Sequence, residues 1–162
     1  MIFRPSQKLA TKLKLSKLRS LSADVNPFVD WSAHLFLVSR TSYVILTNTA
    51  SLYSVVLPAA GLTTEGLFLK AAYHALQSFL EDDGLGAMHR EFIAPLTDSV
   101  QFASALNRSV IGSMNDLILG AKSWLSEEDL PLNEITAKLN ETPLSYLDYV
   151  SPREALRAMG SI

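Results

Sequence analysis

The chain has 162 residues, of which 48% are hydrophobic and 19% are charged, and this composition excludes an intrinsically disordered protein. The sequence has no cysteine, which excludes disulfides, thiolate metal sites and cysteine nucleophiles. It also lacks a run of about 18 apolar residues that would form a membrane-spanning helix, and no apolar segment typical of a secretory signal follows its N-terminus. We therefore expect a single domain over residues 1–162, in the cytoplasm and without membrane contact.

The net charge of −2 is distributed unevenly along the chain. Residues 4–19, here called the basic arm, contain no acidic residue, whereas the rest of the chain has eight basic against 16 acidic side chains and a net charge of −8. Such an arm indicates a nucleic acid or an acidic protein as partner, and the alternative is a solvated helix face that pairs with the protein's own acidic residues. Homo-oligomerisation is also left open. The candidate partner-binding residues of the arm are Lys8, Lys12, Lys14 and Lys17, beside Arg4 and Arg19.

Hydrophobic periodicity in the first half of the chain predicts a short strand and helix, followed by a β-meander. Residues 1–3 are apolar, and a helix that opens at Pro5-Ser6 places Leu9, Ala10 and Leu13 on one face, opposite the lysines. A loop is expected over 22–32. Three apolar runs, at 33–38, 43–47 and 52–57, are joined by short polar linkers, as in antiparallel hairpins. The runs are nearly continuous in apolar residues, so helices should cover the sheet.

The second half of the chain is predicted to be mostly helical. A helix capped by Thr63 or Thr64 runs over 64–82 and stops at Asp83-Gly84. Residues 99–106 predict a fourth or fifth strand, and helices follow over 109–126, from Pro131, and after Ser151. Together these elements predict an α+β fold, in which an antiparallel sheet of four to five strands is packed by the helices 64–82 and 109–126.

The sequence offers no familiar catalytic or metal-binding pattern. The histidines at 34, 74 and 89 lack the spacing of a metal site, and residues 84–88 lack the lysine of a phosphate-binding loop. The acidic clusters at 81–83 and 126–129 lie at predicted helix ends, where solvated carboxylates are ordinary. We therefore expect no metal and no cofactor, and whether the protein is an enzyme is left open.

The polar stretch LNRSVIGSMND, residues 106–116, is the candidate ligand site because it lies where a strand gives way to a helix. A helix start with Ser hydroxyls and Arg108 suits an anion, and a glycine in the first turn, which costs about 1 kcal/mol relative to Ala, suggests close approach of another group. The alternative is a structural corner, in which these side chains bond the adjoining loops. The candidate residues are Asn107, Arg108, Ser109, Gly112, Ser113, Asn115 and Asp116, converging with Thr47 and Asn48.

Four segments of the chain together resemble a family of bacterial proteins known only as a domain of unknown function. The resemblance depends mainly on a T-N-x-x-S-L-Y-S element at 47–54 and an N-R-S-V-x-G-S-M-N-D element at 107–116. It covers most of the chain in order and implies no reaction, cofactor or substrate. Separately, residues 139–156 resemble the tail of some transposase cores, but the acidic triad is missing. We interpret this resemblance as a shared pattern of helix-starting and helix-ending residues in a helix-turn-helix segment.

Two classes of function are compatible with the sequence. The first is a small non-enzymatic binding or interaction protein with a protein or nucleic-acid partner, which agrees with the missing catalytic patterns and with the basic arm. The second is a small enzyme or ligand-binding protein that acts on an anionic metabolite or nucleotide at 107–116.

Overall fold

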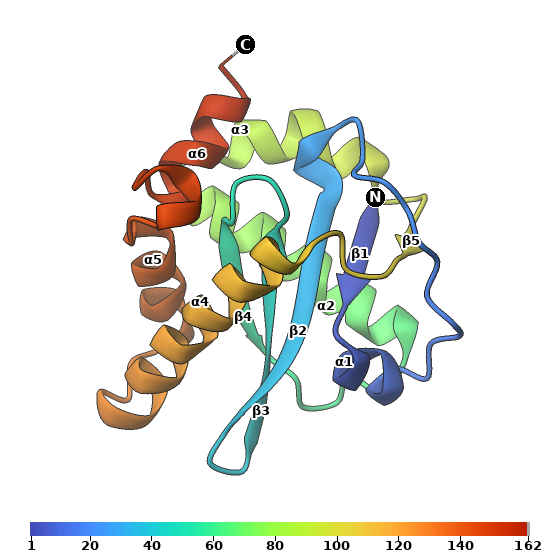
Figure 1. The fold of residues 1–162 in the computed structure, drawn as a ribbon, viewed down its shortest axis with the longest axis horizontal. Coiled ribbons are helices and arrows are strands. Elements are labelled where there is room, and N and C mark those ends of the chain that lie inside the picture. Colours follow the sequence, from blue (N-terminus) through green and yellow to red (C-terminus); the bar gives the residue numbers. More distant parts are fainter. Residues whose placement is uncertain (162) are drawn as a thin grey trace.

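The computed structural model describes residues 1–161 and shows a five-stranded sheet with helices on both faces (Figure 1). The strands lie in the order β4-β3-β2-β1-β5. Their bounds are Ile2–Pro5 for β1, Asp30–Val38 for β2, Thr41–Asn48 for β3, Ser54–Pro58 for β4 and Gln101–Phe102 for β5.

The helices fill most of the remaining chain and dominate the C-terminal half. They are α1 (Gln7–Lys12), α2 (Glu65–Asp82), α3 (Gly86–Met88), α4 (Arg108–Glu127), α5 (Leu132–Glu141) and α6 (Pro152–Met159). Short helical turns occur at η1 (Pro27–Val29), η2 (His89–Ile93), η3 (Ala94–Leu96) and η4 (Ser145–Leu147).

The predicted α+β fold and the antiparallel β2-β3-β4 meander are confirmed. The sheet as a whole differs from the prediction because it is mixed: β1 is parallel to β2 on one side and to β5 on the other. After β1 the chain returns through α1 and the following loop to the end at which β1 began, so β2 starts there and runs in the same direction. A short hairpin cannot make this connection, and a parallel pair requires a longer crossover.

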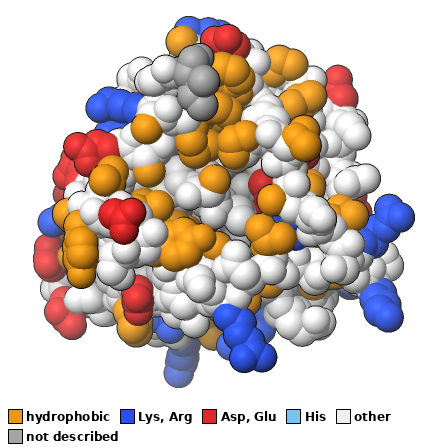
Figure 2. All heavy atoms as spheres, turned by 45° about the horizontal axis from the view of Figure 1, so that its top comes forward, with side chains coloured by type: hydrophobic (Ala, Val, Ile, Leu, Met, Phe, Trp, Pro, Cys, Tyr) orange, Lys and Arg blue, Asp and Glu red, His pale blue; other side chains and the backbone are white. Residues whose placement is uncertain are grey.

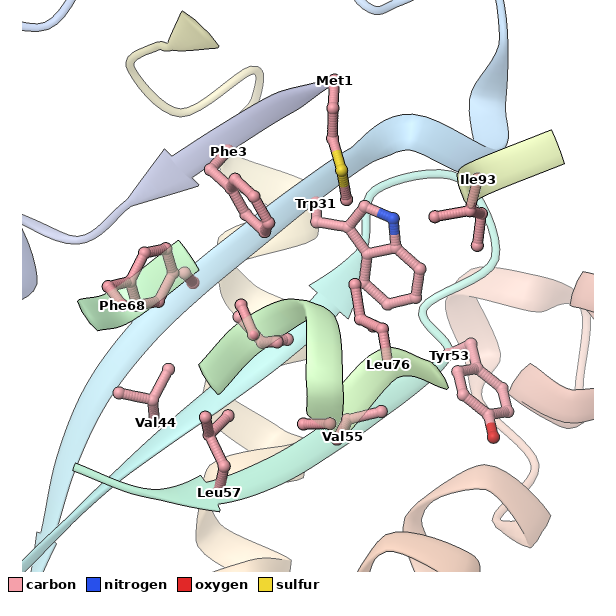
Figure 3. Packing of buried hydrophobic residues seen from close by; sticks show 14 of the residues in the cluster. Met1, Phe3, Trp31, Val44, Tyr53, Val55, Leu57, Phe68, Leu76 and Ile93 are labelled. Atoms are coloured by element: carbon pink, nitrogen blue, oxygen red, sulfur yellow. The ribbon is translucent and has the colours of Figure 1, made fainter. Parts of the chain in front are cut away.

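Two hydrophobic layers lie on opposite faces of the sheet. Figure 3 shows the larger one, in which Phe3, Trp31 and Leu76 meet between the strands and α2, and the rings of Phe3 and Phe68 make an edge-to-face contact at 5.4 Å. On the other face, strand residues such as Ile45 pack against α4 and α5. Because neighbouring strand residues point to opposite faces and both faces are covered, the strands are apolar almost throughout.

The helices begin at the caps that the sequence predicts, with the alternatives now decided. The hydroxyl of Thr64 accepts a hydrogen bond from the Leu67 N–H, so Thr64 rather than Thr63 caps α2. Ser151 and Glu154 form a reciprocal capping box at the start of α6. Between α2 and α4 the chain forms α3, η2, η3 and β5, so the strand predicted over 99–106 is present but only two residues long.

Both edges of the sheet are covered. Outside β5, Arg19 forms an isolated parallel bridge with Ala103. Outside β4, the Asn140 side chain of α5 pairs with both backbone groups of Ser54, accepting from its N–H and donating to its carbonyl at 2.8 Å each. The Thr136 hydroxyl accepts from the Val56 N–H at 3.2 Å. Polar side chains of α5 therefore replace a neighbouring strand at this edge.

Candidate functional site

The polar stretch at the start of α4 forms a capped helix end on the surface. The Asn107 side chain accepts from the Val110 N–H at 2.9 Å, so Asn107 is the cap and the helix begins at Arg108, one residue before the predicted start. Most of the other candidates, Arg108, Ser109, Gly112, Asn115 and Asp116, are exposed, and Ser113 is half-buried.

Gly112 does not serve the close approach that the sequence suggested. A Cβ built at this position would meet no atom within 4 Å outside its own helical turn. The backbone of another segment therefore does not press against Gly112, and the structure gives no steric reason for a glycine there.

The predicted convergence of this stretch with Thr47 and Asn48 does not occur. Both side chains are fully buried. The Asn48 amide donates to the Pro27 carbonyl at 2.8 Å and accepts from the Ser51 N–H at 2.9 Å, and the Thr47 hydroxyl lies 2.9 Å from that of Ser54. Their polar atoms hold the β3–β4 turn together and are not accessible to a ligand at 107–116.

The rest of the T-N-x-x-S-L-Y-S element is structural as well. Tyr53 donates from its hydroxyl to Asp83 at 2.6 Å, which ties the turn to the end of α2. Arg153 of α6 binds the same carboxylate with two nitrogens, at 3.1 and 2.9 Å, and reaches Glu141 at 3.0 Å. Burial and the neighbouring Asp83 raise the pKa of Tyr53 well above its ordinary value, so its hydroxyl remains a donor.

The turn at 47–51 does lie beside the start of α4, through other residues. A hollow of about 210 Å³ is lined by Leu106 and Asn107 on one side and by Thr49, Ala50 and Tyr146 on the other. Leu106 and Tyr146 are partly exposed here, 38% and 42%. Figure 2 shows hydrophobic atoms across the middle of one face of the molecule, with charged side chains mostly at its margin. Because Asn107 is used as the helix cap and Thr47 and Asn48 are buried, the exposed side chains left for the anion site predicted at 107–116 are those of Arg108, Ser109 and Asn115.

Behind this hollow lies a buried ion pair that the sequence analysis missed. Arg4 binds Asp30 with two nitrogens at 2.8 and 2.9 Å, and it is only 1% exposed. It also donates to the carbonyls of Leu21, Ser22 and Ser104, at 3.1, 3.0 and 2.8 Å, so all five N–H groups of the guanidinium are used. Arg4 is therefore a structural residue, and this end of the basic arm cannot contact a partner. The only signal in the sequence is an arginine within an apolar strand segment.

The carboxylate of Asp30 likewise accepts several hydrogen bonds. Besides Arg4, its carboxylate accepts from the Thr49 hydroxyl at 2.9 Å and from the Asp24 N–H at 3.1 Å. Burial by itself raises the pKa of Asp30, but these hydrogen bonds and the charge of Arg4 together lower it below its ordinary value. The carboxylate is therefore ionised at neutral pH and holds the loop before β2 against β1.

The other cations of the basic arm lie at the surface. Lys8, Lys14, Lys17 and Arg19 are exposed and Lys12 is half-buried, and none of them forms a salt bridge within residues 1–161. Their backbone is nevertheless held in place: the Leu15 N–H donates to the Ala10 carbonyl at 3.0 Å and the Ser104 N–H to the Arg19 carbonyl at 2.8 Å. Two hollows of about 460 Å³ each flank residues 14–18.

Other chemical features are sparse in the described chain. Over residues 1–161, no three His, Asp or Glu side chains form a group that could hold a metal ion. In the same range no helix is long and apolar enough to cross a membrane. His89 Nδ1 is buried without a hydrogen-bond partner, and desolvation lowers the pKa of this imidazole.

These features define an α+β protein with a mixed five-stranded sheet, covered on both faces by helices and at one edge by the side chains of α5. The sequence matches the family model described as a domain of unknown function (DUF6933) over residues 2–155, and the chain belongs to this family. A comparison with curated proteins found no match. The resemblance noted in the sequence is therefore confirmed, and it assigns no reaction.

Proposed function

We propose that this protein is a non-enzymatic binding protein whose basic arm binds the phosphate backbone of a nucleic acid. The observation that supports this proposal is the combination of five surface cations without intramolecular partners and a backbone fixed by hydrogen bonds. Arg4 helps to fix this backbone. It binds the carbonyls of Leu21 and Ser22, directly after the arm, and so holds the chain there against the sheet. Cations on a fixed backbone lose less conformational entropy on binding than cations on a flexible tail.

The charge of the remaining chain supports contact through the arm alone. The residues outside the arm have a net charge of −8, which repels phosphate from other surfaces. No large hydrophobic side chain between residues 7 and 19 is prominently exposed, so the arm has no platform on which bases could stack. Binding should therefore depend on phosphate and show little preference for sequence.

The test is a salt series of binding to a fluorescent DNA duplex and to a single-stranded RNA, followed by anisotropy. Each phosphate neutralised contributes about 0.9 to the slope of log K against log salt on duplex DNA, so five cations limit the slope to about −4.5. A Lys8→Ala/Lys12→Ala/Lys14→Ala variant should lose most of the affinity and have a shallower slope.

The matched control is an Arg40→Ala/Lys70→Ala/Lys122→Ala variant, which removes the same charge from other parts of the surface. It should bind much as the wild type does. The proposal is wrong if the wild type does not bind at low salt, or if both triple variants lose affinity equally. Binding of polyglutamate, but of neither nucleic acid, would assign the arm to an acidic protein.

A further inference from the structure

A groove between α2 and α5 lies along β4, on a part of the molecule that the basic arm does not reach (Figure 1). It consists of two hollows of about 430 and 370 Å³, both lined by Phe79. We propose that this α2–α5 groove binds a peptide segment of a partner protein in which a hydrophobic residue lies next to a lysine or arginine.

One end of the α2–α5 groove is apolar. Its walls include Val56, Leu57 and Pro58 of β4, Ala75 of α2 and Leu132 of α5. The small side chains of this part of α2 leave the hollow open, whereas larger ones would fill it. A space of this size with apolar walls suits one or two aliphatic or aromatic side chains.

The other end is acidic. It is lined by Asp82, Asp83 and Glu134. Asp83 is already bound by Arg153, but Asp82 and Glu134 are exposed and form no salt bridge with another residue of 1–161. These two carboxylates, on facing helices, are the charge complement of a cationic side chain.

The strand between the two helices supplies a backbone acceptor for the peptide. In a β-strand the N–H and carbonyl of one residue point to the same side, and the pattern repeats every second residue. Asn140 binds Ser54 and Thr136 binds the Val56 N–H at the outer edge of β4, so the carbonyl of Pro58 faces that edge too. Val56 is fully buried, but Pro58 is exposed. The Pro58 carbonyl can therefore accept a main-chain N–H of the peptide.

A second copy of this chain fits the groove less well than a separate peptide does. Its basic arm has the required charge, but the arm's Leu9 and Leu13 are buried in the core and Arg19 is bridged to Ala103. Leu15 and Leu18, which lie beside its cations, are half-buried in the folded arm. The arm therefore offers the groove less hydrophobic surface than a free extended peptide does.

The experiment selects peptides from a phage-displayed library of random linear sequences on the full-length protein. The expected consensus places a hydrophobic residue within one or two positions of Lys or Arg. Synthetic peptides with this consensus should then bind the wild type in a fluorescence polarisation assay. Two variants should each weaken binding about tenfold or more: Ser78→Trp, which fills the apolar end, and Asp82→Lys, which reverses charge at the acidic end.

Both variants can fold, because Ser78 is only half-buried and Asp82 is the exposed last residue of α2, where a cation suits the helix dipole. Ser123→Trp and Asp116→Lys make the same changes on α4 and should leave binding unchanged. The proposal is overturned if no such consensus emerges, or if Ser78→Trp binds the peptides as the wild type does. A wild-type dimer in sedimentation that Ser78→Trp dissociates would also overturn it, by assigning the groove to a second copy.

Discussion

Two arginine–aspartate pairs join distant parts of this chain, and they differ in how much water reaches them. Arg4 and Asp30 have side chains that are 1% and 3% exposed, whereas Arg153 and Asp83 are 18% and 16% exposed. In the buried pair every guanidinium N–H has a partner within the protein. In the outer pair, Arg153 shares its charge with an exposed glutamate. Removing one partner should therefore cost more stability in the buried pair, where the remaining charge is left without water, than in the outer pair, where water can take its place.

The largest effect is expected from Arg4→Met. This change removes one partner of a buried pair and leaves the Asp30 carboxylate uncompensated, which should lower the free energy of unfolding by about 3–5 kcal/mol. Urea unfolding followed by circular dichroism measures the loss. The Arg4→Met/Asp30→Leu double variant should be less destabilised than the single one. A loss below about 1 kcal/mol for Arg4→Met would show that water enters the site.

Acid should produce the next effect, through the same pair. The pKa of Asp30 is lowered on folding from its ordinary value of 3.8, so its contribution to stability is complete above that value. It is lost as the pH falls from 3.8 through the lowered folded pKa. Urea unfolding at a series of acidic pH values should show wild-type stability falling in this window. The Arg4→Met/Asp30→Leu variant should lack the part of this decline that comes from Asp30. An equal decline in the wild type and in this variant would show that Asp30 is not its cause.

A smaller effect is expected for Arg153→Met in the outer pair. The variant loses hydrogen bonds to Asp83, but water can reach the freed carboxylate, so we expect a loss of about 1–2 kcal/mol. Arg157→Met is the matched control, because Arg157 is exposed and makes only one long contact, 3.3 Å to the Asp83 carbonyl. It should change stability by less than about 0.5 kcal/mol. Equal losses of stability in Arg153→Met and Arg157→Met would show that the Arg153–Asp83 pair stabilises the fold no more than a surface arginine does.

The smallest effect on stability is expected for Arg108→Ala. Arg108 is exposed and forms no salt bridge within residues 1–161, so the free energy of unfolding should change by less than about 0.5 kcal/mol. The same variant tests the anion site at 107–116. In a thermal-shift screen of phosphorylated metabolites, a ligand at 100 times its Kd adds about 2.7 kcal/mol to the wild type. A hit that stabilises Arg108→Ala equally would exclude Arg108 from the site.

The meander and the helices could be predicted because their signals are local. Strand length, linker length and the caps at Thr64 and Ser151 depend on a few neighbouring residues. The placement of β1 and β5 could not be predicted in this way, because it depends on which way the chain returns through residues 6–29. A two-residue strand such as β5 has too little sequence to show a period.

The candidate site was less predictable because polar side chains look the same in sequence whether they bind a ligand or the backbone. The stretch 107–116 and the turn at 47–51 each contain four Asn, Ser or Thr residues. In the structure Asn107 and Asn48 are occupied by backbone groups, whereas Arg108 and Asn115 face solvent. The Pro27 carbonyl that Asn48 binds and the partners of Arg4 lie in other segments of the chain, so only the folded structure reveals them.

The side chains that cover the outer edge of β4 have a consequence for folding during synthesis. The groups that they bind, Ser54 and Val56, precede them by 86 and 80 residues. At 5–20 residues per second, the ribosome needs roughly 4–16 s to reach α5 after β4 has been made. During that interval the strand has an open edge, which is the kind of surface on which nascent chains aggregate. Asn140 and Thr136 therefore act late, and a chain released before residue 140 should depend on chaperones more than a chain that contains all of α5.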